Sequence, residues 1–463
     1  MKNDLKGIII YGAGNAGIRL AKKLLRIQTV SFFVDDDLRK IKKNILKIRV
    51  LSFKEFRELS KEKKISNVIV AIPSLSNENK NKLFQKLYPY CETIFSLPSN
   101  KELINDQINI ADLSNITFAD IISRKNIEID YSKLNYLKKK NVLVTGAGGS
   151  IGSELSRQIS KLKPTKLIML DHSESSLQKL KSSEKIKLSN KNRLILGNIL
   201  DEGFIATIIN KYKIDLIFHT AAYKHVEILE DNIFNATKNN IFGTLSLIEA
   251  ANSANKKIQF VYVSTDKAVK PIGILGYTKG IGEVLTENLY DNSKNLKTSI
   301  VRFGNVFASD GSVFNKFVDQ IKRKNRIELT DKKMERYFMS IEEACHLLLK
   351  CPIISLRKNI FILNMGKPIK ILNLIKKMKK FLNKDIKIKI FGKRKGEKIK
   401  EKLSYRDLKK TKDKNIFFTK NPTYKDKNGL IKLLRNLSDA LDNQNEKIIK
   451  KSLINFYKNY ERN

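Results

Sequence analysis

Two stretches of the chain repeat one pattern of hydrophobic and polar positions. Each begins with a short apolar run, passes through a glycine-rich turn, and continues with apolar residues at helical spacing before another apolar run. The first stretch starts at "GIIIYGAGNAG" (Gly7–Gly17) and the second at "NVLVTGAGGSIGSELSRQI" (Asn141–Ile159). A later apolar run, "VIVAIPS" (Val68–Ser74), fits the first pattern. Because buried strands that alternate with helices build parallel sheets, the sequence predicts an α/β fold with two Rossmann-like doubly wound parallel sheets.

The two stretches indicate two domains joined by a connector. A chain of 463 residues is long enough for two or three domains with their own cores. We expect a Rossmann-like nucleotide-binding-type domain at residues 1–100 and a second nucleotide-binding fold at residues 138–463. Residues 101–137 lack a clear hydrophobic period, so we interpret them as the connector.

Charge changes this picture little. The formal net charge is +43, from 90 Lys and Arg against 47 Asp and Glu, a balance also found in nucleic-acid-binding proteins. The basic residues are mostly Lys, however, and they are spread over the whole length beside abundant Ile and Asn. Aromatic residues do not interleave with the basic runs as they do in surfaces that stack on bases. We therefore expect no nucleic-acid partner.

Cysteines and apolar runs bear on the location of the protein. Cys91, Cys345 and Cys351 form no CxxC spacing, which is typical of a reducing cytoplasm and argues against a structural metal site. No apolar run approaches the ~18–20 residues that span a bilayer. The chain also enters a strand and glycine loop too early for a signal peptide. We expect a cytoplasmic protein with no membrane span.

The first glycine loop carries a dinucleotide-binding pattern. Gly12, Gly14 and Gly17 form GxGxxG between a strand and a helix, and Asp35 lies near the end of the next strand. Because GxGxxG alone is weak, a Rossmann-like module that binds no nucleotide stays open as the alternative.

The second glycine loop is more specific. Gly146, Gly149 and Gly152 form TGxxGxxG, where backbone N–H groups at a helix N-terminus face a pyrophosphate. Asp171 ends the next strand, 25 residues after Gly146, near the spacing of a ribose-binding acid. An acid there accepts from both ribose hydroxyls and repels a 2′-phosphate, which favours NAD over NADP. The alternative is that Asp171 caps the following helix.

The segment "STDKAVKPIGILGYTKGIGE" (Ser264–Glu283) resembles the catalytic centre of short-chain dehydrogenases with one part replaced. That superfamily places a Tyr four residues before a Lys on one helix. Here the Lys is Lys279, and Leu275 occupies the Tyr position. Tyr277 is two residues from Lys279, and side chains at that spacing point roughly 200° apart. Tyr277 is therefore not expected to substitute for the missing Tyr.

A longer series of motifs carries a closer resemblance. The blocks "TGAGGSIGSEL", "LDHSE", "AAYKHVEILEDN", "STDKAV", "VRFGNVFASDGSV", "MERYFMSIEEA" and "GKRKGEK" run in order from about Lys138 to Leu403. They resemble the bacterial nucleotide-sugar 4,6-dehydratases of polysaccharide and glycan synthesis, which are extended short-chain dehydrogenases that act on UDP-N-acetylglucosamine. The N-terminal stretch looks like the module that precedes the dehydratase in larger, membrane-anchored members. Lys395 departs from the Pro of the family's RPGEK-like motif.

The resemblance implies an extended short-chain dehydrogenase fold with a small C-terminal substrate lobe, NAD as cofactor, and dehydration across C5–C6 through a C4 ketone. Leu275 is similar to the larger members, which carry Met there and retain the configuration at C5, so retention is predicted. The implied cofactor contacts are Gly146, Gly149, Ser150, Ile151, Gly152, Asp171, Asn198, Ala221, Asn240 and Lys279.

The implied catalytic residues are Thr265, Asp266, Lys267 and Lys279. Asp266 is the expected acid for the leaving hydroxyl, Lys267 the expected base at C5, and Thr265 a hydrogen-bonding partner of O4. We expect the positive charges of Lys279 and of the nicotinamide to keep Lys267 neutral. We expect burial, partly by Leu275, to keep Asp266 protonated. An exposed turn pair is the alternative for Asp266 and Lys267.

The implied substrate contacts are Lys224, His225, Asn305, Ser312, Arg336, Arg394 and Glu397. We expect a UDP-sugar substrate and a homo-oligomer. One competing function is a nucleotide-sugar epimerase on the same scaffold, although epimerases of this type keep the Tyr. Another is a non-catalytic nucleotide-sensing or nucleic-acid-binding protein, which would tolerate the loss of both Asp266 and Lys267.

Overall fold

The computed structural model divides the chain into two compact units. The first comprises residues 1–126 and 373–387, and the second comprises residues 127–372 and 388–463. Most of the predicted connector, 101–137, lies outside the described residues, so the predicted domain boundaries stay a prediction. The described residues are 7–26, 29–60, 65–75, 77–96, 114–115, 127, 129–183, 186–290, 293–307, 309, 311–324, 326–354, 360–382, 386–419 and 426–460.

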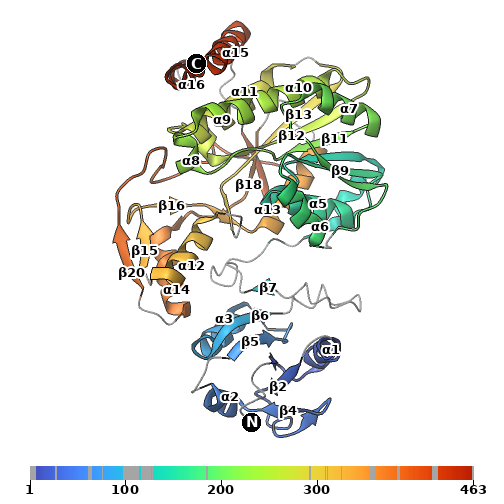
Figure 1. Cartoon of the computed structure of the whole chain (residues 1–463), viewed down its shortest axis with the longest axis vertical. Coiled ribbons are helices and arrows are strands. Elements are labelled where there is room, and N and C mark those ends of the chain that lie inside the picture. The colour runs from blue at the N-terminus through green and yellow to red at the C-terminus, as the bar shows by residue number, and fades with distance from the viewer. Residues whose placement is uncertain are drawn as a thin grey trace. The chain divides into compact units, whose positions relative to one another are not determined.

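The first unit is built on a mainly parallel sheet (blue in Figure 1). Its strand order is β3-β4-β2-β1-β5-β6-β7, with antiparallel pairs only at the two edges. The strands are β1 (Ile8–Tyr11), β2 (Val30–Val34), β3 (Asn44–Ile45), β4 (Ile48–Leu51), β5 (Ile65–Val70), β6 (Cys91–Ser96) and β7 (Ser114–Asn115). The helices are α1 (Asn15–Leu24), α2 (Phe53–Leu59) and α3 (Asn77–Leu87).

The glycine loop of the first unit packs closely against helix α1. A side chain at Gly17 would place its Cβ 1.9 Å from the carbonyl oxygen of Gly12, so only glycine allows this approach. Asp35 accepts a hydrogen bond from the backbone N–H of Ala13 at 2.7 Å and pairs with Lys40. The carboxylate is therefore already engaged by the loop beside it.

The second unit contains a nine-stranded sheet (green to orange in Figure 1). Its order is β10-β9-β8-β11-β12-β13-β18-β22-β21. Neighbouring strands are parallel except in the pairs β18–β22 and β22–β21, which are antiparallel. The strands are β8 (Asn141–Thr145), β9 (Lys166–Asp171), β10 (Asn192–Leu196), β11 (Leu216–His219), β12 (Ile258–Thr265), β13 (Leu296–Phe303), β18 (Ile360–Leu363), β21 (Lys409–Lys410) and β22 (Ile416–Thr419). The predicted α/β fold with two parallel sheets is confirmed.

Two hydrophobic clusters bury the two faces of this sheet. One cluster packs η5 (Tyr131–Lys139), α5 (Ser150–Lys161), α6 (Glu174–Ser182) and α13 (Ile341–Lys350). The other packs α7 (Glu202–Tyr212), α8 (Val226–Glu230), α9 (Ile233–Thr237), the π-helix η6 (Lys238–Phe242), α10 (Gly243–Asn252), α11 (Ile274–Asn288), α15 (Lys427–Asp442) and α16 (Glu446–Tyr460). Helix α11 is buried along almost its whole length, which is typical of a helix covered on every side.

The remaining described elements are not strands of the two main sheets. β14 (Asn305–Val306) pairs with β17 (Phe338–Met339), and β16 (Glu335–Arg336) pairs with β19 (Ile369–Lys370). The remaining elements are the 3₁₀ helices η2 (Tyr88–Tyr90), η7 (Asp266–Ala268) and η8 (Cys351–Ile353), with α12 (Val313–Lys324), β15 (Arg326–Leu329), α14 (Ile371–Leu382) and β20 (Lys387–Ile390).

Cysteine, metal and membrane features can be stated for the described residues. Cys91, Cys345 and Cys351 are all buried, and none of them forms a disulfide bond. Within the described ranges, no cluster of His, Cys, Asp or Glu could hold a metal ion. None of the helices in the described part of the chain is both long and apolar enough to cross a membrane.

Candidate active site

A cavity of about 500 Å³ opens in the second unit at the carboxyl ends of β11, β12 and β13. This is the edge of a parallel sheet where ligands bind, and the volume is that of a small-molecule site. Residues predicted from the sequence gather here from segments far apart along the chain. Those that line it are Ile151, Lys224, His225, Thr265, Lys267, Lys279, Asn305, Ser312, Arg336, Arg394 and Glu397.

The second glycine loop has the geometry of a phosphate cradle. Gly146 has a φ of +67°, and a Cβ there would lie 2.6 Å from the Cα of Ala221. A Cβ at Gly152 would lie 2.1 Å from the carbonyl oxygen of Gly146. Helix α5 therefore begins directly against the loop, with Gly149 as its N-cap and with Ser150 and Ile151 in its first turn. Backbone N–H groups at such a helix start favour a pyrophosphate.

Asp171 lies beside this loop at the end of β9. Its carboxylate accepts from the N–H of Gly148 at 2.9 Å and from the N–H of Ser173 at 2.9 Å. Each oxygen keeps a second lone pair for an outside donor. The cap of helix α6 is Ser173, so the alternative that Asp171 caps that helix is wrong.

The predicted cofactor contacts Asn198 and Asn240 differ in their surroundings. Asn198 is exposed after β10, where its side chain accepts from the N–H of Leu200 at 3.0 Å. Asn240 is buried, and its amide bonds the backbone N–H and C=O of Tyr223 at 2.9 and 3.1 Å and the hydroxyl of Thr278 at 3.2 Å. Asn240 therefore joins helix α11 to the segment that carries Lys224 and His225.

Lys267 lines the cavity and forms an ion pair with Asp266, which is not among the lining residues. The ammonium donates to the carboxylate of Asp266 at 3.0 Å and to the amide oxygen of Asn305 at 3.2 Å. Thr265 donates to the same carboxylate oxygen at 2.9 Å. Asp266 is fully buried, so the alternative of an exposed turn pair is wrong.

The charge of Lys267 differs from the sequence-based expectation. Burial lowers the pKa of Lys267, but the carboxylates of Asp266 and Glu401 offset this, and the pKa lies above its ordinary value. Like-charge crowding by Lys279 therefore does not keep Lys267 neutral in the ligand-free protein, and the expected effect of the nicotinamide charge stays a prediction. Arg336 and Lys398 are like charges near Lys267, and Arg336 acts to lower its pKa.

Lys279 is the lysine whose charge is disfavoured. Burial lowers its pKa to about 7, although Glu283 one helical turn away acts in the opposite direction. Its ammonium lies 3.9 Å from the ring centre of Tyr262. Glu283 itself is buried against Arg302 and accepts from the hydroxyl of Ser264 at 2.5 Å. Lys279 can therefore take up a proton near neutral pH.

Leu275 and Tyr277 lie as their helical spacing predicts. Leu275 lines the cavity with Lys267 and Lys279. Tyr277 packs against the ring of Tyr457 in helix α16, with the ring centres 5.4 Å apart. Tyr277 is thus part of the contact between α11 and α16, and the expectation that it does not replace the missing Tyr agrees with its position.

The predicted substrate residues also contact one another and the backbone. Arg394 forms an ion pair with Glu227, and Glu397 accepts from the hydroxyl of Thr330 at 2.9 Å. Ser312 accepts from the N–H of Asn315 at 3.4 Å at the start of α12.

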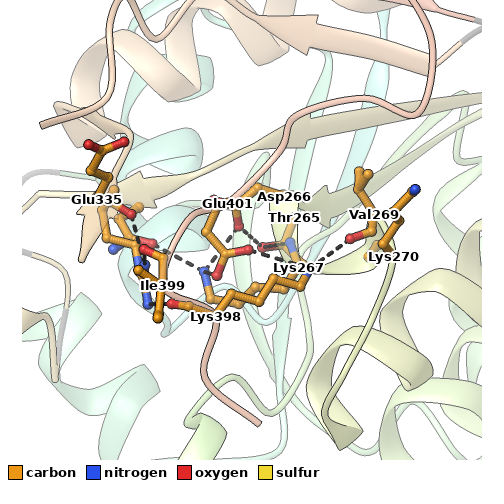
Figure 2. Close-up of polar contacts among 12 residues, drawn as sticks. Thr265, Asp266, Lys267, Val269, Lys270, Glu335, Lys398, Ile399 and Glu401 are labelled. Atoms are coloured by element: carbon orange, nitrogen blue, oxygen red, sulfur yellow. Dashed lines mark hydrogen bonds and ion pairs between the residues drawn. The ribbon is translucent and has the colours of Figure 1, made fainter. Parts of the chain in front are cut away.

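Arg336 is more enclosed than a surface arginine. Its guanidinium donates to the carbonyl oxygens of Glu335, Lys398 and Ile399 at 2.8, 2.7 and 3.1 Å. These bonds fix the chain segment Arg394–Glu401 against strand β16 (Figure 2). The guanidinium that we expected to contact the substrate therefore also anchors a neighbouring loop.

Sequence reasoning missed two charged residues in that segment. Glu401 is buried and lies 3.7 Å from the ammonium of Lys267, and Lys398 donates to the carbonyl of Val269 at 2.6 Å. Figure 2 shows both side chains directed toward the Asp266–Lys267 pair. Charged residues alternate throughout Lys393–Glu401, so the sequence offers no signal that singles out one carboxylate as buried.

Comparison with known sequences identifies relatives of this chain. The sequence profile of the family described as "Polysaccharide biosynthesis protein" matches residues 142–421. The "Capsular polysaccharide biosynthesis protein CapD" of Staphylococcus aureus is 36% identical over 416 residues, covering 86% of this chain and 69% of that protein. A "UDP-N-acetylglucosamine 4,6-dehydratase (inverting)" of Campylobacter jejuni is 31% identical over 218 residues, covering 45% and 62%. A "UDP-glucose 4-epimerase" of Rickettsia bellii is 30% identical over 284 residues, covering 60% and 82%.

Solved structures share the fold of more than half of the chain. The X-ray structure of Pen from Bacillus thuringiensis matches with a TM-score of 0.57 and 31% identity, over 62% of this chain and 91% of that one. The structure of DesIV, a dTDP-glucose 4,6-dehydratase from Streptomyces venezuelae, matches with a TM-score of 0.50 and 22% identity, over 57% and 88%. The second similarity concerns the fold alone.

Proposed function

This chain belongs to the polysaccharide biosynthesis protein family, and on that premise we propose that it is an NAD-dependent 4,6-dehydratase of UDP-N-acetylglucosamine that retains the configuration at C5. The observation that carries the proposal is the ion pair of the buried Asp266 with Lys267, which lines the cavity together with Thr265 and Lys279. An elimination needs an acid and a base side by side, and this pair supplies both. The relatives named as a dehydratase and as an epimerase support a nucleotide-sugar enzyme of this class.

The glycine loop and Asp171 fit a dinucleotide. Gly146 and Gly152 let helix α5 start against the loop, and the carboxylate of Asp171 is fixed beside it. We assign the pyrophosphate to this helix start and the ribose hydroxyls to Asp171, which favours NAD over NADP. When bound, NAD supplies the oxidation at C4 and the matching reduction at C6.

The Asp266–Lys267 pair can act as acid and base without gaining or losing protons. Carboxylate with ammonium and carboxylic acid with amine contain the same protons, and one transfer along the 3.0 Å hydrogen bond interconverts them. In the second form, the amine of Lys267 takes the C5 proton while Asp266 gives its proton to the C6 hydroxyl. The C5–H and C6–O bonds break, the C5=C6 bond forms, water leaves, and the ion pair is restored.

We assign removal of the proton from the C4 hydroxyl to Lys279 and Thr265. With a pKa of about 7, Lys279 is partly neutral at neutral pH and can accept the proton of that hydroxyl, relayed through Thr265 and a water or the ribose. Arg336, Arg394 and Glu397 line the cavity on the side that we assign to the UDP group. An arginine suits a diphosphate because its planar group makes paired hydrogen bonds.

Incubation of the purified chain with NAD and UDP-N-acetylglucosamine tests the proposal. A product lighter by one water, with the NMR signals of a 6-deoxy-4-keto sugar, is the expected result. A product of unchanged mass with altered ring couplings would instead identify an epimerase. An unchanged sugar with this and other UDP-hexoses would contradict both enzymatic functions.

A further inference from the structure

Glu401 is not a member of the Asp266–Lys267 pair but lies close enough to influence the charge of Lys267. One carboxylate oxygen is 3.7 Å from the ammonium of Lys267, and the other is 3.5 Å from the ammonium of Lys398. The side chain is 2% exposed. Its Oε2 has no hydrogen-bond partner in the described part of the chain. Oε2 is nevertheless ion-paired with Lys398, and Oε1 faces Lys267, so the charge of this buried carboxylate acts on both ammonium groups.

The surrounding loop fixes this carboxylate in place. Arg336 holds the carbonyls of Lys398 and Ile399, and the N–H of Glu335 donates to the carbonyl of Ile399 at 2.9 Å. Lys398 is bonded in turn to the carbonyl of Val269, next to the catalytic turn. As Figure 2 shows, the segment is held both at strand β16 and beside the catalytic turn.

The groups that face Lys267 come from four places. Asp266 on η7 and Glu401 are negative, Arg336 on β16 and Lys398 are positive, and Asn305 on β14 accepts a hydrogen bond. The ammonium of Lys267 lies within 3.7 Å of two carboxyl groups, those of Asp266 and Glu401. Loss of the pair's proton to solvent would leave Asp266 and Glu401 as two buried negative charges beside a neutral amine. The proton is therefore held within the pair, where it can still pass between Asp266 and Lys267.

We propose that Glu401 is a positioning residue that keeps one proton on the Asp266–Lys267 pair, so that the pair enters each turnover with both its acid and its base. Without that charge, the amine would remain a base, but at raised pH the pair would lack the proton that the leaving hydroxyl needs. The raised pKa of Lys267 agrees with this role. The expected change in turnover rests on the proposed dehydratase activity, whereas the expected change in the protonation of Lys267 does not.

Competitive labelling measures that effect without turnover. The full chain is treated at pH 9 with a trace of an amine-acylating reagent, and mass spectrometry compares Lys267 with the exposed Lys54. Only the neutral amine reacts. Removal of an opposite charge at this distance lowers a pKa by ~1–3 units, so Glu401→Gln should raise the relative labelling of Lys267 by about tenfold or more, up to the level at which the amine is fully neutral. Glu401→Asp keeps a more distant charge and should give a value between those of wild type and Glu401→Gln.

Glu335→Gln is the matched control. Glu335 lies on strand β16 against the same segment, but its side chain pairs with the exposed Lys400, so the same chemical change should leave Lys267 labelling unchanged. Unchanged labelling in Glu401→Gln, or equal labelling in Glu401→Asp and Glu401→Gln, would overturn the proposal. If Glu401→Gln does not fold, an increase in Glu401→Asp above wild type supports the proposal and no increase overturns it.

Turnover gives the second readout. In Glu401→Gln the alkaline fall of kcat should move ~1–3 pH units lower, while activity near neutral pH changes far less. An unmoved alkaline limb in an active variant would overturn the proposed role. If the wild-type protein dehydrates no UDP-sugar but the labelling ratio still rises in Glu401→Gln, the proposed function fails and the electrostatic role of Glu401 stands.

Discussion

Two lysines in one cavity differ in charge because their neighbours differ. Lys279 is buried against the ring of Tyr262 and has a pKa of about 7, whereas Lys267 is held between the carboxylates of Asp266 and Glu401. The same residue type can thus accept a proton at one position and retain one at the other.

Replacement of Lys267 should remove the base at C5 and leave the binding contacts in place. We expect Lys267→Ala to lower kcat by ~10²–10⁴, the usual contribution of one general base, with the dissociation constants of NAD and UDP-sugar nearly unchanged. Single-turnover kinetics and calorimetric titration measure the two quantities. A turnover close to that of wild type would remove Lys267 from the mechanism.

The pH dependence below neutrality should report Lys279. Its folded-state pKa is lowered to about 7, so the side chain is charged and cannot accept the C4 hydroxyl proton below that pH. We expect kcat to rise about tenfold per pH unit up to ~7 and then to level off. Lys279→Arg stays cationic throughout and should show low activity without this limb. The same limb in Lys279→Arg would assign it to another group.

Stereochemistry at C5 depends on Leu275 and Tyr277. Leu275 lines the cavity and cannot donate a proton, and Tyr277 packs against Tyr457. With Lys267 as the single group that removes and returns the proton, the configuration at C5 should be retained. The reaction in D₂O should place deuterium at C5 of UDP-2-acetamido-2,6-dideoxy-α-D-xylo-hexos-4-ulose. NMR couplings of the L-arabino isomer in the first-formed product would overturn this assignment.

At the scale of single elements, helix α11 connects the candidate active site to helix α16. It carries Leu275 and Lys279 on its cavity side, and helix α16 packs against it. A Cβ at Gly280 would lie 1.6 Å from the hydroxyl oxygen of Tyr457 and 2.8 Å from the ring carbon that bears it. Only glycine permits this approach of the two helices.

A double-mutant cycle tests that contact. Gly280→Ala should lower the free energy of unfolding by ~1–3 kcal/mol because the added methyl group forces α16 away from α11. Tyr457→Phe removes the nearest atom, so the double variant should recover part of the loss. Thermal or urea unfolding measures all four chains. Strictly additive effects would show that Gly280 and Tyr457 do not interact.

What the sequence can predict differs between elements and contacts. Strands β1 and β8, their glycine loops and the helices that follow were predictable because periodic apolar residues and glycine spacing are local. The turn that carries Asp266 and Lys267 was also recognisable from its motif. The charge of Lys267 was not predictable, because it depends on Glu401, which only the fold brings within 3.7 Å. The bond from Asn240 to Tyr223 was equally beyond reach, since side-chain direction there depends on tertiary packing.

At the scale of the whole molecule, the residues with assigned catalytic roles all belong to the second unit. That unit begins with contacts of its own: the N–H of Ile127 donates to Glu343 at 2.6 Å, and the ring of Tyr131 lies 6.0 Å from that of His346. These contacts place the start of an independently folding part at Ile127 or earlier.

Removal of the first 126 residues should therefore spare the chemistry. We expect a chain that begins at Ile127 to fold and to dehydrate the sugar with a turnover of the same order as the full chain. Circular dichroism and the mass-based assay measure the two properties. A folded but inactive truncated chain would show that the first unit completes the site or the active oligomer.

The buried thiols allow the local opening of each unit to be measured separately. Cys91 lies in the first unit, whereas Cys345 and Cys351 lie in the second, and burial raises the pKa of both thiols in the second unit. A thiol-reactive dye attacks the thiolate and needs access to it, so the closed protein should stay unlabelled. The labelling rate at Cys91 against that at Cys345 and Cys351 therefore follows local opening of the two units separately in one sample, without any engineered probe.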